Sequence, residues 1–96
     1  MVSPGIAEVD LHIEKLHDNP GNLNSDDMLQ IQLAFFRTCL NHAVINRMKK
    51  VIFIHGVGRG VLKTEMQREL DKYDNLAYMD APISKYGVGA MEVYFK

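Results

Sequence analysis

Two short stretches of the sequence hold residues that could do chemistry. Asp10 and His12 stand two positions apart in VDLH (residues 9–12), and His55 opens the stretch HGVGRG (residues 55–60). Histidine titrates near neutral pH and can move a proton in either direction, and a nearby carboxylate can fix its tautomer or hold a metal ion. Asp10, His12 and His55 are therefore the candidate catalytic residues, with acid–base catalysis as the expected chemistry.

The glycines that follow His55 predict an anion site. Glycine lets backbone amides turn toward a ligand, and the helix expected after this loop offers its positive N-terminus. The candidate phosphate-binding residues are Gly56, Gly58, Arg59, Gly60 and Lys63. The spacing is neither that of a P-loop nor that of the dinucleotide fingerprint. A plain strand-to-helix turn, in which His55 caps backbone groups, is the alternative interpretation.

Hydrophobic periodicity indicates the elements that must position these residues. Apolar and polar residues alternate in the first and last segments, VIFI is continuously apolar, and apolar residues recur every three to four positions in two longer segments. The predicted strands cover residues 6–13, 51–56, 76–79 and 90–96, and the predicted helices cover residues 25–48 and 61–73. VIFI is expected to be buried on both faces, and the last strand to have one wet face.

This order, β-α-β-α-β-β, predicts an α/β two-layer sandwich. Right-handed crossovers that advance in one direction place both helices on one face of a mixed four-stranded sheet, with the last strand antiparallel between the second and third. The predicted core residues are Leu33, Phe36, Leu40, Ile52, Ile54 and Leu70. Because ligands bind beyond the carboxyl ends of parallel strands, Asp10, His12 and His55 should meet at one edge.

Composition narrows the classes of protein. Ninety-six residues make one domain, 1–96, and the single cysteine, Cys39, cannot form an internal disulfide, which favours a cytoplasmic location. No apolar stretch is long enough to span a membrane, so no membrane partner is expected.

The net charge of −1 gives no overall sign of nucleic-acid binding. Residues 37–72, however, hold eight basic and three acidic residues, which can form a local basic face or a scattered, solvated surface.

Three segments resemble the Smr (small MutS-related) domain family. VDLH resembles the family's Asp-Leu-His-Gly motif, IHGVGRGVLK (residues 54–63) its His-Gly-x-Gly motif, and YGVGAMEVYFK (residues 86–96) its Gly-Ala-Thr-like last strand. The resemblance runs from about residue 6 to residue 96 and implies the same two-layer sandwich. The DLHIEKL stretch is similar to a subgroup in which the domain ends a longer bacterial protein, which implies that residues 1–96 can be such a C-terminal domain.

The resemblance implies binding of nucleic acid, DNA or RNA, because members of the family include DNA-nicking and RNA-cleaving endonucleases as well as proteins that only bind. It assigns Asp10 and His12 to the first motif, and His55, Gly56 and Gly58 to the second. Two positions depart from the family pattern: Ile13 replaces a glycine, and Met91 replaces a threonine. These departures and the acidic loop after the first strand favour binding over cleavage.

Two classes of function stay open at this point: an endonuclease that hydrolyses phosphodiester bonds, and a non-catalytic module that uses the same glycine loop for nucleic acid or a protein partner. Asp10 and the two histidines could also ligate a divalent metal ion. A protein metal site needs three or four ligands, so no residue is assigned to a metal and no cofactor is firmly predicted.

Overall fold

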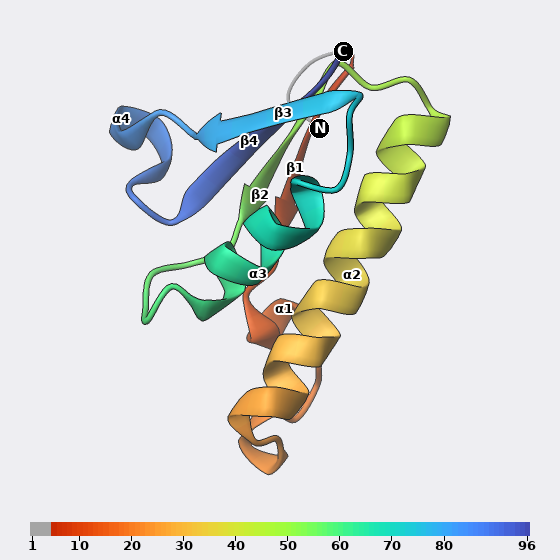
Figure 1. Ribbon diagram of the computed structural model, residues 1–96. Helices are drawn as coiled ribbons and strands as arrows, with labels where there is room; N and C mark the ends of the chain where they lie inside the picture. Colours follow the sequence, from red (N-terminus) through yellow and green to blue (C-terminus); the bar gives the residue numbers. More distant parts are fainter. Residues whose placement is uncertain (1–4) are drawn as a thin grey trace.

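A mixed sheet with strand order β1-β2-β4-β3 forms one layer of the structure, a computed structural model that describes residues 5–96 (Figure 1). The strands are β1 (Ile6–Asp10), β2 (Lys50–Ile54), β3 (Leu76–Asp80) and β4 (Ala90–Phe95). The helices are α1 (Ile13–Leu16), the 3-10 turn Pro20–Asn22, α2 (Ser25–Ile45), α3 (Val61–Leu70) and α4 (Ile83–Tyr86). The predicted topology is confirmed: β1 and β2 are parallel, and β4 lies antiparallel between β2 and β3.

Helix α2 begins where the sequence predicted and ends earlier. Asn24 and Asp27 form a capping box, in which each side chain accepts from the other residue's backbone N–H. At the other end, the Met48 amide turns back to the Ala43 carbonyl, and Arg47 takes a left-handed φ of 53°. This is a Schellman motif, so the helix stops at Ile45 rather than at residue 48. Helix α3 likewise stops at Leu70 rather than at residue 73.

The core lies between the sheet and the layer formed by α2 and α3, which cover the same face (Figure 1). Phe36 of α2 meets Phe53 of β2 edge-on with ring centroids 4.8 Å apart, and both side chains are fully buried. Burying a side chain of this size contributes roughly 1.5–3 kcal/mol. Of the predicted core residues, Leu33, Phe36, Leu40, Ile52 and Leu70 are buried, whereas Ile54 is only half-buried. Ile54 packs in the small cluster on the opposite face, where fewer atoms cover it.

The last strand was predicted to expose one face to solvent. On the side of the sheet away from α2 and α3, the structure differs from this prediction. Glu92 of β4 is only 6% exposed. Its carboxylate lies 3.3 Å from the Lys50 ammonium group and accepts a hydrogen bond from the Tyr94 hydroxyl. Pairing with a cation and a hydroxyl offsets the cost of burying this charge, so a polar residue in an alternating pattern need not be solvated.

One edge of the sheet collects three strand ends. Because β3 is antiparallel to β4, and β4 is antiparallel to β2, β3 runs in the same direction as β1 and β2. Asp10, His55 and Asp80 thus end, or directly follow, parallel-running strands at a common edge, which we call the carboxyl edge. No helix among residues 5–96 is both long and apolar enough to cross a membrane.

Candidate functional site at the carboxyl edge

Asp10 ends β1 and orients His12. Its Oδ1 atom accepts from the His12 backbone N–H at 2.9 Å and from His12 Nδ1 at 2.7 Å. This turn pulls the chain out of the strand at Asp10, which is why the predicted strand over residues 6–13 is three residues too long. Leu11 is fully buried, and its carbonyl accepts from the Gln32 side chain on α2, which fixes the turn to the helical layer.

The hydrogen bonds define the protonation of this pair. Burial alone would raise the pKa of Asp10, but the hydrogen bonds and charge of His12 hold it below its usual value. A carboxylate only accepts hydrogen bonds, so His12 Nδ1 carries the proton and Nε2 is an acceptor in the neutral ring. A Cβ atom placed on Gly56 would lie 2.9 Å from His12 Nε2. The ring of His12 therefore points across to the start of the glycine loop.

Gly56 is constrained from two sides. Its φ of 85° is in the left-handed region that favours glycine. Gly89 packs against it so closely that a Cβ on Gly89 would lie 3.1 Å from the Gly56 carbonyl carbon. The Gly89 carbonyl also accepts from the amides of His55 and Gly56, at 2.9 and 3.0 Å. Two of the three segments that resemble the Smr family, residues 54–63 and residues 86–96, thus meet at Gly56 and Gly89.

His55 lies next to this point in a different environment from His12. Its Nδ1 donates to the Gly56 carbonyl at 2.8 Å. Within residues 5–96, His55 Nε2 is the one buried side-chain nitrogen or oxygen without a hydrogen-bond partner. Burial lowers the pKa of His55 below its usual value, because its effect and that of the Lys63 charge outweigh the hydrogen bond to Gly56 and the charge of Asp80, which raise it. His55 is therefore held in the neutral form.

The rest of the glycine loop is exposed and leads into α3. Gly58 and Arg59 are exposed, and Gly60 is the N-cap of α3 with a φ of 79°. The first backbone N–H groups of a helix lack intrahelical acceptors, and Gly60 offers no side chain to satisfy them. They remain available to an anion at the end of the loop.

Lys63, one of the predicted phosphate-binding residues, has a partner within the protein. Its ammonium group lies 2.8 Å from Oδ1 of Asp80, the last residue of β3. Asp80 was not among the predicted site residues, although the rule that placed Asp10 and His55 at strand ends applies equally to the third strand. The missing signal was the boundary of that strand, which was set at residue 79.

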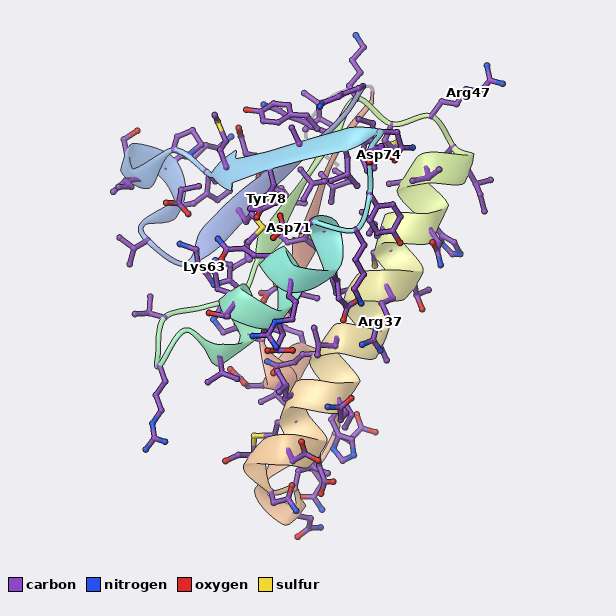
Figure 2. The ribbon with its side chains drawn as sticks, in the orientation of Figure 1. Arg37, Arg47, Lys63, Asp71, Asp74 and Tyr78 are labelled. Atoms are coloured by element: carbon purple, nitrogen blue, oxygen red, sulfur yellow. The ribbon has the colours of Figure 1, made fainter. Side chains whose placement is uncertain are left out.

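Most of the basic residues of segment 37–72 do not gather at the carboxyl edge. Arg37, labelled beside α2 in Figure 2, forms a two-pronged ion pair with Glu69 that links α2 to α3. Arg47 and Lys49 line a hollow at the opposite end of the sheet. The scattered-surface interpretation of these charges fits better than a single basic face.

Other features lie apart from this site. An apolar hollow of about 250 Å³ opens between β1 and α2 and includes Val9, Cys39 and Met48 in its lining. Burial raises the pKa of the Cys39 thiol, which therefore stays protonated. Within the described part of the chain, no three or more His, Cys, Asp or Glu side chains are grouped to hold a metal ion.

The fold and the site together define a two-layer α/β domain with a histidine- and glycine-lined edge. The model of the Smr domain family matches residues 28–96, well over half of the sequence, and the chain belongs to this family. The match begins after Asp10 and His12, so the first motif rests on the resemblance and on its position in the fold.

A solved structure supports the fold over nearly the whole chain. The Smr domain of Thermus thermophilus MutS2 matches with a TM-score of 0.66 and 20% identity, over 94% of this chain and 98% of that one. At this identity the likeness concerns the fold. Comparison with curated protein sequences gave no match.

Proposed function

We propose that this chain binds nucleic acid, with the phosphodiester backbone held at the carboxyl edge of the sheet. The observation that carries the proposal is the contact between His12, from the first strand end, and Gly56, where the glycine loop begins. His55 directly precedes Gly56 in the chain, and the glycine turn leads from this contact to the N-terminus of α3. Membership in the Smr family and the resemblance of the three motifs favour nucleic acid over other anions.

The groups on this edge suit a phosphate chemically. The uncapped amides at the start of α3 can donate to phosphate oxygens, and the helix dipole favours negative charge there. Arg59 is exposed on the loop and forms none of the ion pairs found among residues 5–96. A domain with a net charge of −1 must rely on such local charges rather than on its overall field.

Phosphodiester hydrolysis is a second candidate function, favoured by the 2.7 Å contact between Asp10 and His12. With Nδ1 bound to the carboxylate, His12 Nε2 can take a proton from a water that attacks phosphorus and later return it to the oxygen that leaves. Asp10 would stabilise the imidazolium formed between these steps. Met91 weighs against this candidate, because it is fully buried in the core and supplies no hydroxyl at the edge.

A protein partner at the same loop is the alternative to nucleic acid. Val57 and Val61, which are 79% and 51% exposed, flank the loop and give it apolar surface. A protein ligand would use these side chains, whereas a phosphate backbone would use the amides and cations. Binding that is insensitive to salt would favour the protein partner.

The decisive experiment incubates the 96-residue chain with labelled DNA and RNA, in the presence of divalent metal and in the presence of a chelator. The wild type is compared with His12→Ala and His55→Ala. His42→Ala is the matched control, because His42 is exposed on α2 and outside the site. We expect salt-sensitive binding that both site variants weaken and the control leaves unchanged. Equal binding by all four proteins would contradict the proposed site, and product formed only by the wild type and the control would establish cleavage.

A further inference from the structure

Asp80 brings a negative charge to an edge where the proposed ligand is also negative. It ends β3, which runs parallel to β1 and β2, so its carboxylate lies on the same edge as His55. Figure 2 shows Lys63 extending from the start of α3 toward the end of β3, where the 2.8 Å ion pair with Asp80 forms. The charges of Lys63 and Asp80 act on the pKa of His55 in opposite directions.

We propose that Asp80 sets the anion affinity of the site by competing with phosphate for Lys63, an inference that rests on the proposed function. In the free protein the carboxylate neutralises Lys63, and a bound phosphate takes its place. Asp80 is thus a residue that tunes selectivity rather than one that reacts.

The exposure of the two side chains fits such an exchange. Asp80 is 66% exposed and Lys63 is 30% exposed. Ion pairs in contact with water are weak, so a phosphate that also reaches the helix amides can displace the carboxylate.

The competition has a consequence that can be measured. A protein that neutralises phosphates releases counterions, and the logarithm of its affinity falls with the logarithm of salt concentration in proportion to their number. Because a bound phosphate replaces Asp80 at Lys63, this lysine contacts the phosphate backbone with or without the carboxylate. Removal of the carboxylate should therefore raise the affinity and leave the number of phosphate contacts unchanged.

The test titrates a short fluorescein-labelled single-stranded oligonucleotide with wild type, Asp80→Asn and Asp80→Glu at several salt concentrations. Asp80→Asn should bind about two- to fivefold more tightly at low salt, the range expected for loss of an exposed ion pair. Its salt dependence should differ from that of the wild type by less than about 0.7, the value for one phosphate contact on a single strand, because Lys63 contacts the phosphate in both complexes. Asp80→Glu keeps the charge and should behave as the wild type.

Two controls separate competition from a simple change in net charge. Asp74→Asn removes the same charge from the turn that enters β3, at the opposite end of the strand from Asp80 (Figure 2). It should give no gain or a clearly smaller one. Lys63→Met combined with Asp80→Asn should lose the gain, because the freed cation is gone. Unchanged or weaker binding by Asp80→Asn, or an equal gain by Asp74→Asn, would overturn the proposal.

A second readout does not depend on nucleic acid. The hydrogen bond and charge of Lys63 hold the pKa of Asp80 below its usual value, so Lys63→Met should raise it in a carboxyl NMR titration. A pKa that does not move would show that the pair is absent and would overturn the competition. If the titration succeeds but neither wild type nor Asp80→Asn binds, the proposed function fails and this inference fails with it. If wild type binds and Asp80→Asn shows no gain, only the inference on Asp80 fails.

Discussion

The ends of β1 and β2 each present a histidine, and the two rings are treated in opposite ways. The His12 side chain is 44% exposed, and both its backbone N–H and its Nδ1 are bonded to Asp10. His55 is half-buried and donates only to the carbonyl of the next residue, with Nε2 buried and unpaired. One ring is oriented by a carboxylate at the surface, and the other is desolvated behind it.

This difference indicates different roles for two histidines that were both predicted to be catalytic. An oriented, accessible Nε2 suits contact with a ligand or proton transfer to it. A buried nitrogen without a partner cannot reach a ligand in this conformation and costs free energy while it remains unpaired. We therefore expect His12 to act on the ligand, and His55 to shape the glycine loop through its bond to the Gly56 carbonyl.

The largest expected effect is on the rate of cleavage, and it distinguishes the role of His12 from that of His55. If the domain cleaves nucleic acid, His12→Ala should lower the rate about 10²–10⁴-fold, the usual range for loss of a general acid or base, with little change in thermal stability. Single-turnover cleavage beside a melting curve measures both quantities. A His12→Ala protein that cleaves at the wild-type rate, while His55→Ala is inactive and still folded, would reverse the assignment of tasks.

A stability measurement tests the contact between Gly56, which follows β2, and His12, which follows β1. Gly56→Ala should destabilise the fold by about 1–3 kcal/mol, because alanine is strained at a positive φ and its Cβ would meet His12 Nε2. Gly58→Ala is the matched control: no atom lies within 4 Å of a Cβ there, so a change within about 0.5 kcal/mol is expected. Urea denaturation of the three proteins gives the free energies of unfolding, and equal losses at both positions would show that the contact has no special role.

The sequence predicts those parts of the fold that depend on interactions between residues close together in the chain. Apolar periodicity is local, so it predicted both long helices, four strands and the strand order that follows from right-handed crossovers. Short-range polar bonds changed the boundaries. The side chain of Asp10 ended β1 early, and a left-handed Arg47 ended α2 early, and neither interaction appears in a hydrophobic pattern.

The site was predictable only in part, for a similar reason. The strand-end rule and the motifs placed Asp10, His12, His55 and Gly56 together, as the structure has them. The pairing of Lys63 with Asp80 joins residues 17 positions apart, and the burial of Glu92 depends on Lys50, 42 positions away. Such contacts depend on how distant elements pack against one another, which the local pattern of one sequence does not contain.

A smaller effect is expected on the tautomer of His12, and none is expected on that of His55. In the wild type the carboxylate of Asp10 holds the proton on His12 Nδ1. Asp10→Asn offers an amide that can either donate or accept, so His12 should become a mixture of tautomers. The ring nitrogen shifts of His55 should not change, since its Nδ1 donates to a backbone carbonyl. Nitrogen-15 NMR of both rings tests this, and an unchanged His12 would show that Asp10 does not select its tautomer.

The smallest effect is the dependence of stability on pH that His55 should cause. Burial, with the charge of Lys63, lowers the pKa of His55 in the folded protein below the ordinary value of 6.5. The unfolded chain therefore binds this proton at a higher pH than the folded chain does, so protonation favours unfolding. The stabilisation from neutral His55 should be complete above pH 6.5 and decline as the pH falls through the folded pKa. His55→Gln cannot titrate, so subtracting its profile of unfolding free energy from that of the wild type isolates the contribution of this ring. A difference that stays flat, or that rises toward acid pH, would mean that burial does not lower the pKa of His55 and that the contrast between the two strand ends does not hold in solution.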